Sequence, residues 1–184
     1  MTLGDGKRRV LMLLDEYSSG GVLTADRDID ARMNDFFDIA QRDMAQWQPI
    51  LRRATVTLDG TGRQALPQDV AQVRSIRRDN GRARDCEIID GALVYPAGDT
   101  SALTLDYVAR PAAITPDTAD THVFEVSEEA AGCLPFFVAA QQLIPDLVVD
   151  YGAFYDLYLK LRNLLPRDTS APSTGGMRQA LWRG

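Results

Sequence analysis

The chain has 184 residues, of which 45% are hydrophobic, and this length is enough for one domain with a full hydrophobic core. It carries 20 basic and 26 acidic side chains, a net charge of -6, so it lacks the basic surplus with which dedicated nucleic-acid-binding proteins contact phosphates. Arginine supplies all but two of the basic side chains, and its planar guanidinium suits charge pairs within protein contacts.

The N-terminal region does not have the pattern of an export signal. Basic residues at 7–9 precede an apolar run from Val10 to Leu14, which ends at Asp15. A secretory signal needs about 7 to 15 apolar residues and a membrane-spanning helix about 20. Cys86 and Cys133 are too far apart to form a CxxC pair. We therefore expect a soluble, unexported protein with reduced cysteines and no membrane contact.

Two helices are predicted near the N-terminus. Apolar residues in the segment 7–17 recur at steps of three and four, which places them on one helical face. A second helix is predicted over 26–47, with Thr24 or Asp26 as N-cap, and it ends before Pro49 because proline has no amide hydrogen to donate. The predicted buried face of this helix consists of Ile29, Met33, Phe36, Ala40, Met44 and Trp47.

From residue 50 the apolar period changes from that of a helix to that of a strand. Alternating residues predict strands at 54–58, 92–95, 102–108 and 123–126. The triplet Asp79-Asn80-Gly81 is typical of a hairpin turn, and we expect it to join a strand around Val73 to a partner strand that contains Cys86, Ile88 and Ile89.

Two further helices are predicted before a polar tail. Ser127 is the expected N-cap of a third helix, which Pro135 would bend without ending it. The last helix is predicted after Pro145 and Asp146, with apolar residues from Leu147 to Leu165 at steps of four and three. Beyond Pro166 the composition is typical of a flexible linker.

The predicted fold class is α+β. We expect a four-helix bundle made of the N- and C-terminal helices (7–48 and 127–165), a small antiparallel β insertion (50–126), and an extended C-terminal tail (166–184). Residues 1–165 would then form a single domain.

The sequence offers little material for catalysis or metal binding. His122 is the one histidine, and we expect it to be solvated or structural; a catalytic pair with Cys133 is the alternative. The segment 26–30 spaces three aspartates like a calcium loop, but Ala31 and Phe37 stand where that loop needs glycine and glutamate. We therefore predict no catalytic residue, no cofactor, no metal and no enzymatic activity.

Two segments are candidate partner interfaces. Five arginines surround the predicted hairpin, and they could contact phosphate, another subunit or only water. The interleaved Asp79 and Asp85, and the absence of aromatic residues, favour solvation or protein contacts over DNA. The apolar residues at the end of the tail are either a disordered terminus or an anchor for a partner. The candidate interface residues are Arg74, Arg77, Arg78, Arg82, Arg84, Met177, Leu181 and Trp182.

An ordered set of segments carries a family resemblance. After the helical region 7–47 comes the corner Leu66-Pro67-Gln68-Asp69-Val70, then the strand Leu103-Thr104-Leu105-Asp106-Tyr107 with Arg110-Pro111 nearby. Ser127-Glu128-Glu129-Ala130 then opens the helix Leu134-Pro135-Phe136-Phe137-Val138-Ala139-Ala140-Gln141. In these segments the sequence resembles the head-tail connector (adaptor) proteins of tailed bacteriophages, which include the tail tubular proteins of short-tailed phages.

The resemblance implies a structural protein of the virion neck, assembled in the host cytoplasm. Its expected partners are further copies of itself in a ring of about twelve subunits (a dodecamer), the portal protein above, and a downstream tail or stopper protein. DNA would pass through the lumen without sequence-specific binding. A head-completion or stopper protein is the nearest alternative. A small ligand-binding protein or hydrolase is a more distant one, disfavoured because no set of polar residues converges.

Overall fold

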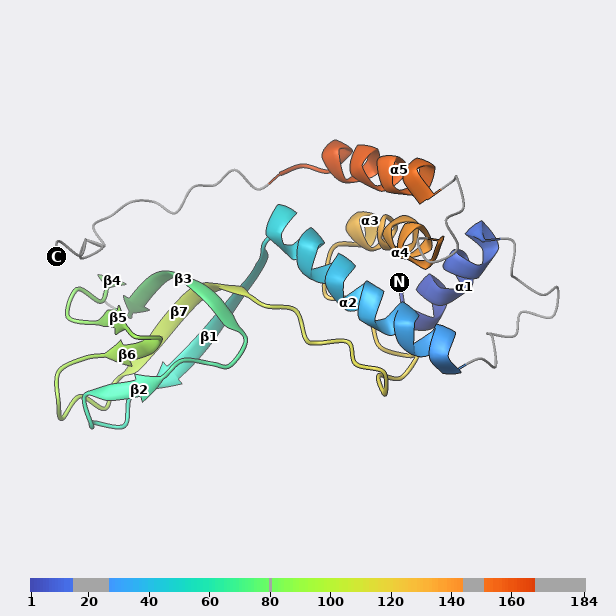
Figure 1. Ribbon diagram of the computed structural model, residues 1–184. Coiled ribbons are helices and arrows are strands. Elements are labelled where there is room, and N and C mark those ends of the chain that lie inside the picture. The colour runs from blue at the N-terminus through green and yellow to red at the C-terminus, as the bar shows by residue number, and fades with distance from the viewer. Residues whose placement is uncertain (15–26, 80, 144–150, 168–184) are drawn as a thin grey trace, which may run out of the picture. The chain divides into compact units, whose positions relative to one another are not determined.

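The computed structural model describes residues 1–14, 27–79, 81–143 and 151–167 (Figure 1). The described residues divide into two compact units. The helical unit combines residues 1–50 with 109–167, and the β unit comprises residues 51–108. The helices are α1 (Leu3–Leu13), α2 (Arg27–Trp47), the single turn α3 (Glu128–Ala131), α4 (Leu134–Leu143) and α5 (Tyr151–Leu164).

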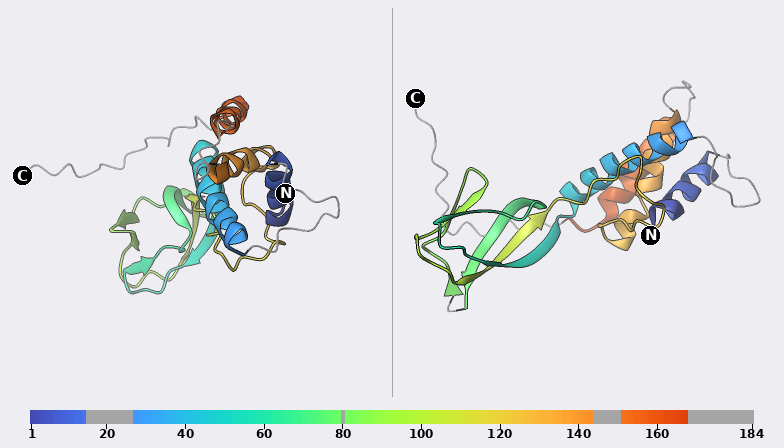
Figure 2. Two further views of the ribbon diagram at one scale, coloured as in Figure 1. Left: turned by 45° about the vertical axis from the view of Figure 1, so that its right-hand side comes forward. Right: turned by 90° about the horizontal axis from the view of Figure 1, so that it is seen from below.

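Helix α4 is the centre of the helical unit. Its sequence is apolar on nearly every side, and a helix of this kind must be buried all round. Helices α1, α2 and α5 pack against it (Figures 1 and 2). The buried side chains at this centre come from both ends of the chain: Leu3, Val10, Met33, Phe37, Ala40, Met44, Leu134, Val138, Ala139 and Tyr158.

Helix α1 begins at Leu3, earlier than the predicted start at residue 7. Thr2 and Asp5 form a capping box, in which each side chain bonds the backbone amide of the other residue. The helix tolerates two glycines because they allow close contacts. A Cβ atom on Gly4 would lie 3.0 Å from the Cβ of Asp120, and one on Gly6 would lie 2.9 Å from the Cζ of Phe37.

Helix α2 holds the backbone of the return segment 110–126, which contains no helix or strand. The buried Asn34 donates to the carbonyl oxygen of Thr115 at 2.9 Å. The buried Gln41 donates to the carbonyl oxygen of Ala112 and accepts from the amide of Glu125. Because these two buried side-chain amides bond the backbone of the segment, they stabilise a long stretch that has no regular hydrogen-bond ladder of its own.

The C-terminal end of α5 is fixed to the end of α2. Tyr158 and Arg162 both donate to Asp43, at 2.5 and 2.7 Å. Burial, reinforced by the bond to Asp43, raises the pKa of Tyr158 well above its ordinary value. Trp47 has two cations over its ring, with the guanidinium carbons of Arg162 and Arg167 at 4.9 and 4.6 Å from the ring centroid.

The β unit contains seven strands in two antiparallel sheets. One sheet has four strands in the order β1-β7-β3-β4, and the other has three in the order β2-β6-β5. The strands are β1 (Ile50–Thr57), β2 (Arg63–Ala65), β3 (Val70–Arg78), β4 (Gly81–Arg82), β5 (Glu87–Ile89), β6 (Ala92–Val94) and β7 (Ala102–Ala109).

The β unit has a hydrophobic core of its own. Alternate residues of β7 are buried, as expected for a strand with one covered face. The buried side chains of this core come from both sheets and the loops between them: Leu58, Ile76, Ala83, Cys86, Leu93, Tyr95, Leu103, Leu105 and Tyr107.

The predicted fold class, a four-helix bundle with a small β insertion, is wrong. The protein is α+β, but its strands form two sheets around a separate core and make up much of the described chain. Helices from both ends do pack together. The third predicted helix is two helices, however: Ser127 caps α3 as expected, and α4 begins at Leu134 with Pro135 in its first turn, where the missing amide hydrogen costs nothing.

Two strand predictions are also wrong. The segment 123–126 forms only a single bridge, between Thr2 and Val123. Across the turn, β3 pairs with β4, with Arg78 opposite Gly81, whereas the segment predicted as that partner is β5 and pairs with β6 in the other sheet. A turn signal fixes where the chain reverses, but the pairing of strands depends on contacts distant in sequence.

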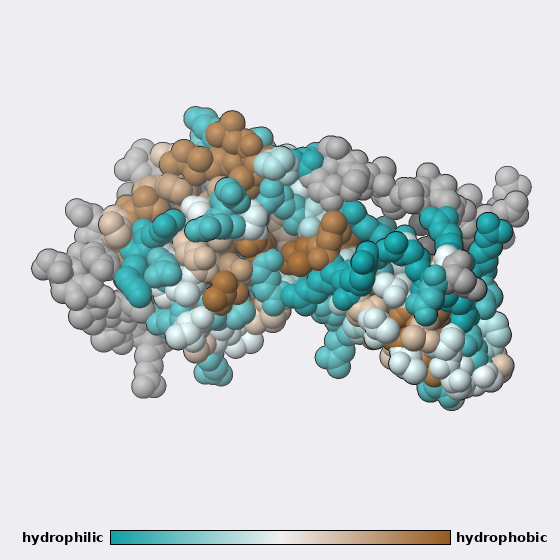
Figure 3. Space-filling view, turned by 180° about the vertical axis from the view of Figure 1, so that it is seen from behind, coloured by the Kyte–Doolittle hydropathy of each residue, from teal (hydrophilic) through white to brown (hydrophobic). Residues whose placement is uncertain are grey.

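Exposed apolar residues gather on α5. Figure 3 shows a brown area over the part of the helical unit that carries this helix, whereas the visible face of the β unit is mainly hydrophilic. Tyr155, Leu157 and Leu164 are the exposed large apolar side chains of α5, and Leu164 is 81% exposed. Among the described residues, no helix combines the length and apolar character needed to cross a bilayer.

The glycines of α1 and α5 give a matched test of the helical packing. Gly6→Ala should lower the free energy of unfolding by about 1–3 kcal/mol, because the new methyl group overlaps Phe37. Gly152→Ala in α5 meets no atom within 4 Å and should raise it by up to about 1 kcal/mol, the gain in helix propensity. Urea denaturation of the two variants measures both, and equal effects would contradict the close approach at Gly6.

Candidate functional site

The predicted arginine cluster does not form one surface. Successive side chains of a strand point to opposite faces, so Arg77 and Arg78 of β3 lie on different sides of the four-stranded sheet. Arg78 turns toward Cys86, on the side of the buried Ile76, and Arg77 turns toward Asp106 on the opposite, outer face. Arg74 is half-buried, whereas Arg82 is exposed, as is the last member of the cluster, Arg84.

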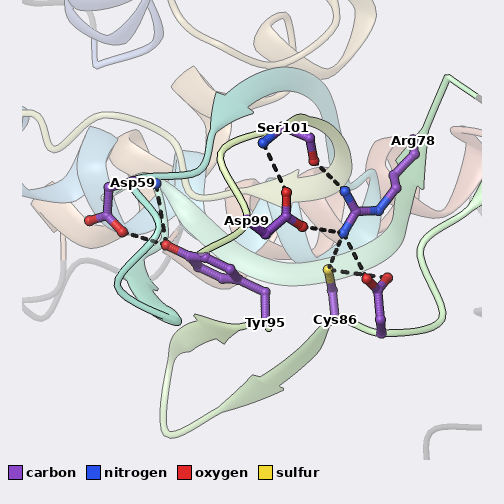
Figure 4. Close-up of polar contacts among 7 residues, drawn as sticks. Asp59, Arg78, Cys86, Tyr95, Asp99 and Ser101 are labelled. Carbon is purple, nitrogen blue, oxygen red and sulfur yellow. Dashed lines mark hydrogen bonds and ion pairs between the residues drawn. The ribbon is translucent and has the colours of Figure 1, made fainter. Parts of the chain in front are cut away.

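Arg78 is the centre of a polar network (Figure 4). Its Nη2 atom lies 2.6 Å from Asp99 and 2.8 Å from Asp85, and its Nη1 atom donates to the hydroxyl of Ser101. The hydrogen bond from Arg78 lowers the pKa of Asp99 well below its ordinary range, and the same bond raises the pKa of Arg78. The guanidinium is therefore occupied by groups of its own chain.

A second network fixes the turn after β1. The hydroxyl of Tyr95 donates to Asp59 at 2.5 Å, and the same carboxylate accepts from the amide of Thr61 at 2.9 Å. The bond from Tyr95, followed by those from Thr61, lowers the pKa of Asp59 to about 2. The turn Asp59-Gly60-Thr61-Gly62 therefore has a structural role, with positive φ at both glycines.

Asp106 contacts two arginines on the outer face of the four-stranded sheet. It accepts from Arg53 at 2.6 Å, from the hydroxyl of Ser75 at 2.8 Å, and from Arg77. These bonds, that from Arg53 first, lower the pKa of Asp106 to about 2. Arg53 and Arg77 come from the two strands on either side of β7, so the carboxylate links three strands.

Two segments that are far apart in the sequence meet in the β unit. Asp69, from the corner Leu66-Pro67-Gln68-Asp69-Val70, accepts from the hydroxyl of Tyr107 in β7 at 3.1 Å. Arg52 donates to the same carboxylate at 2.7 Å. Burial, followed by the bond to Asp69, raises the pKa of Tyr107. This contact ties the corner to the sheet, and neither segment alone indicates it.

The remaining candidates are the two cysteines, the calcium-like aspartates and the tail residues. Burial raises the pKa of both Cys86 and Cys133, which keeps the thiols protonated. Asp30 pairs with the buried Lys7 at 2.8 Å, which accounts for one aspartate of the calcium-like triplet. Within the described part of the chain, no group of three or more His, Cys, Asp and Glu side chains could hold a metal ion. The tail candidates Met177, Leu181 and Trp182 lie outside the described residues.

The site therefore consists of aspartates that form ion pairs with arginines within the β unit. The sequence contained a signal for part of it, because the period of two already separates Arg77 from Arg78. Asp99 and Asp106 were missed, since they lie 21 to 53 residues from their arginines and only strand pairing brings them close. No protein-family model matches the chain, and a search of curated proteins gave no significant match.

Acid should weaken the β unit through Asp106. A carboxyl whose pKa is lowered on folding stabilises the fold above its unfolded value, near 3.8, and this contribution is lost as the pH falls toward about 2. Between about pH 4 and about pH 2 the melting temperature should therefore fall more steeply for the parent protein than for Asp106→Asn.

At neutral pH, Asp106→Asn should melt at a lower temperature than the parent, because Arg53 and Arg77 lose their anion. The control is Asp79→Asn, an exposed residue with no ion pair among the described residues, which should follow the parent at every pH. Circular dichroism measures all three proteins. Equal slopes for the parent and Asp106→Asn in acid would contradict the assignment.

Proposed function

We propose that this chain is a structural, non-enzymatic adaptor subunit of a tailed bacteriophage, which forms a ring beneath the portal through which DNA passes. The observation that carries the proposal is the bond from Tyr107 to Asp69. It joins two of the segments on which the family resemblance depends, and it explains physically why a leucine-proline-x-aspartate corner and a strand ending in tyrosine would occur together.

The exposed apolar residues of α5 support a role in assembly. Leu164 is 81% exposed and Leu157 is 38% exposed on the same helix. Their spacing of seven residues places them on one side of it. Neighbouring apolar residues on a surface are typical of a contact with another protein, and neighbouring subunits or the portal would supply that contact.

The paired arginines support passage of DNA rather than binding. Arg53, Arg77 and Arg78 each have an aspartate within 3 Å. Phosphate binding would require these arginines to give up carboxylates that they already contact, and a protein that neutralises few phosphates gains little from counterion release. A channel that DNA must leave freely needs such weak retention.

Assembly on a portal tests the proposal. Light scattering after size exclusion should give a monomer or weak oligomer for the isolated chain, because one heterologous interface closes into a ring only when neighbours are positioned around the axis. Mixed with a purified portal ring, the chain should elute with it in a fixed ratio close to one copy per portal subunit. Failure to bind any of several portals, with the fold intact by circular dichroism, would refute the adaptor role.

Two C-terminal truncations separate the proposed anchor from the fold. Removal of residues 168–184 should weaken binding to the portal and leave the melting temperature nearly unchanged, because α5 and its contacts stay complete. Removal of 166–184 should also lower the melting temperature, since Gln48 donates to the carbonyl oxygen of Pro166 at 3.0 Å and Arg167 lies over Trp47. Unchanged portal binding by the shorter truncation would show that the tail is not an anchor.

A further inference from the structure

The four-stranded sheet has two open edges. Strand β1 is the first in the order, and β7 is its one neighbouring strand among the described residues. At the other side β4 pairs with Arg77 and Arg78 only, so within the described chain no strand lies beside the β3 edge from Val70 to Ser75. An open edge presents backbone amides and carbonyls that readily pair with another strand.

The direction of the backbone groups in β1 follows from one hydrogen bond. The amide of Leu58 donates to the carbonyl oxygen of Ser101 at 3.0 Å, on the β7 side. Residues that bond a given neighbour alternate along an antiparallel strand, so even-numbered residues of β1 face β7 and odd-numbered ones face the open edge. A second bond is consistent with this assignment. The side chain of Gln64 donates to the carbonyl oxygen of Thr57 at 3.2 Å, as expected if the carbonyl of this odd-numbered residue faces away from β7. The residues that offer backbone groups are therefore Leu51, Arg53 and Thr55.

We infer that β1 pairs with the β3 edge of a second copy of this chain, which joins the sheets of neighbouring subunits. Both strands run antiparallel to β7, so they are parallel to each other and begin at the same end of the sheet. A contact between two different edges is heterologous, and its repetition by every copy closes a ring when the rotation allows. This inference names the contact between copies and rests on the proposed function for the ring.

The side chains along the two edges fit together. Leu51 is 57% exposed at the start of β1. Along the β3 edge, the side chains of Ala71, Val73 and Ser75 lie on the same face of the sheet as that of Arg77. Pairing in the same direction brings Leu51 level with the apolar residues Ala71 and Val73 of the neighbouring copy, whose side chains are both smaller than that of leucine. Arg53 keeps Asp106 as its partner within its own sheet, so this face brings no unpaired like charges together.

Disulfide trapping tests the pairing directly. Paired strands lie about 4.8 Å apart, within the Cα separation that a disulfide spans. Two double variants, Leu51→Cys with Ala71→Cys and Leu51→Cys with Val73→Cys, cover the two nearest registers. Oxidation of the concentrated protein should join one of them into dimers, trimers and longer chains. The control is Leu51→Cys with Val123→Cys, because Val123 is 58% exposed, like Leu51, and lies on neither edge.

Chains should form about tenfold faster in one of the edge variants than in the control, because pairing raises the local thiol concentration. Addition of Thr55→Pro should abolish this difference. Its proline removes an amide that faces the open edge and leaves the β7 ladder intact, so the melting temperature should stay close to that of the parent. The inference would be overturned if both edge variants cross-linked at the same rate as the control, in the isolated protein and also in the portal-bound assembly.

The two proposals fail separately. Chains that form without any portal binding would support the strand pairing and refute the adaptor role. Portal binding in which neither edge variant cross-links faster than the control would support the adaptor role and refute the pairing. Oxidation products limited to dimers would show a symmetric contact, which also refutes the head-to-tail arrangement.

Discussion

The burial of α4 is the constraint on which the helical unit depends. A helix with apolar residues on nearly every side has no face to present to water. Helices α1 and α2 come from one end of the chain and α5 from the other, and together they cover it. Because the helices that cover α4 come from both ends of the chain, the chain leaves this unit after Trp47 and returns to it near Ala109. The β unit is the segment between these two points.

The return to the helical unit explains the polar residues on the inner face of α2. Asn34 and Gln41 are fully buried, although an apolar side chain would pack there at lower desolvation cost. Their amides bond the backbone of the return segment, which has no strand or helix to satisfy it. The same helix thus packs α4 with its apolar residues and fixes the path back from β7 with its polar ones.

Elements whose apolar residues repeat with a single period could be predicted from the sequence alone. The second helix, the strand Ala102–Ala109 and the Ser127 cap were all predicted, because each depends on neighbours in sequence. Helix α1 was placed too late since Gly4 and Gly6 disfavour a helix locally, and only the contacts with Asp120 and Phe37 show why glycine is needed. Asp99 and Asp106 were missed as partners of the arginines because sheet order is not a local property, whereas Asp85 lies only seven residues from Arg78.

Charged residues are distributed unevenly between the two units. Residues 51–108 contain eight arginines and eight acidic residues, whereas residues 1–50 and 109–167 contain 10 basic and 17 acidic residues. The acidic surplus therefore belongs to the helical segments, and the arginine-rich segment is neutral. Because its arginines are bound by aspartates at short distance, this segment offers neither net positive charge nor free guanidinium groups at those positions. Such ion pairs order the strands of the sheet, and the paired arginines attract phosphates weakly.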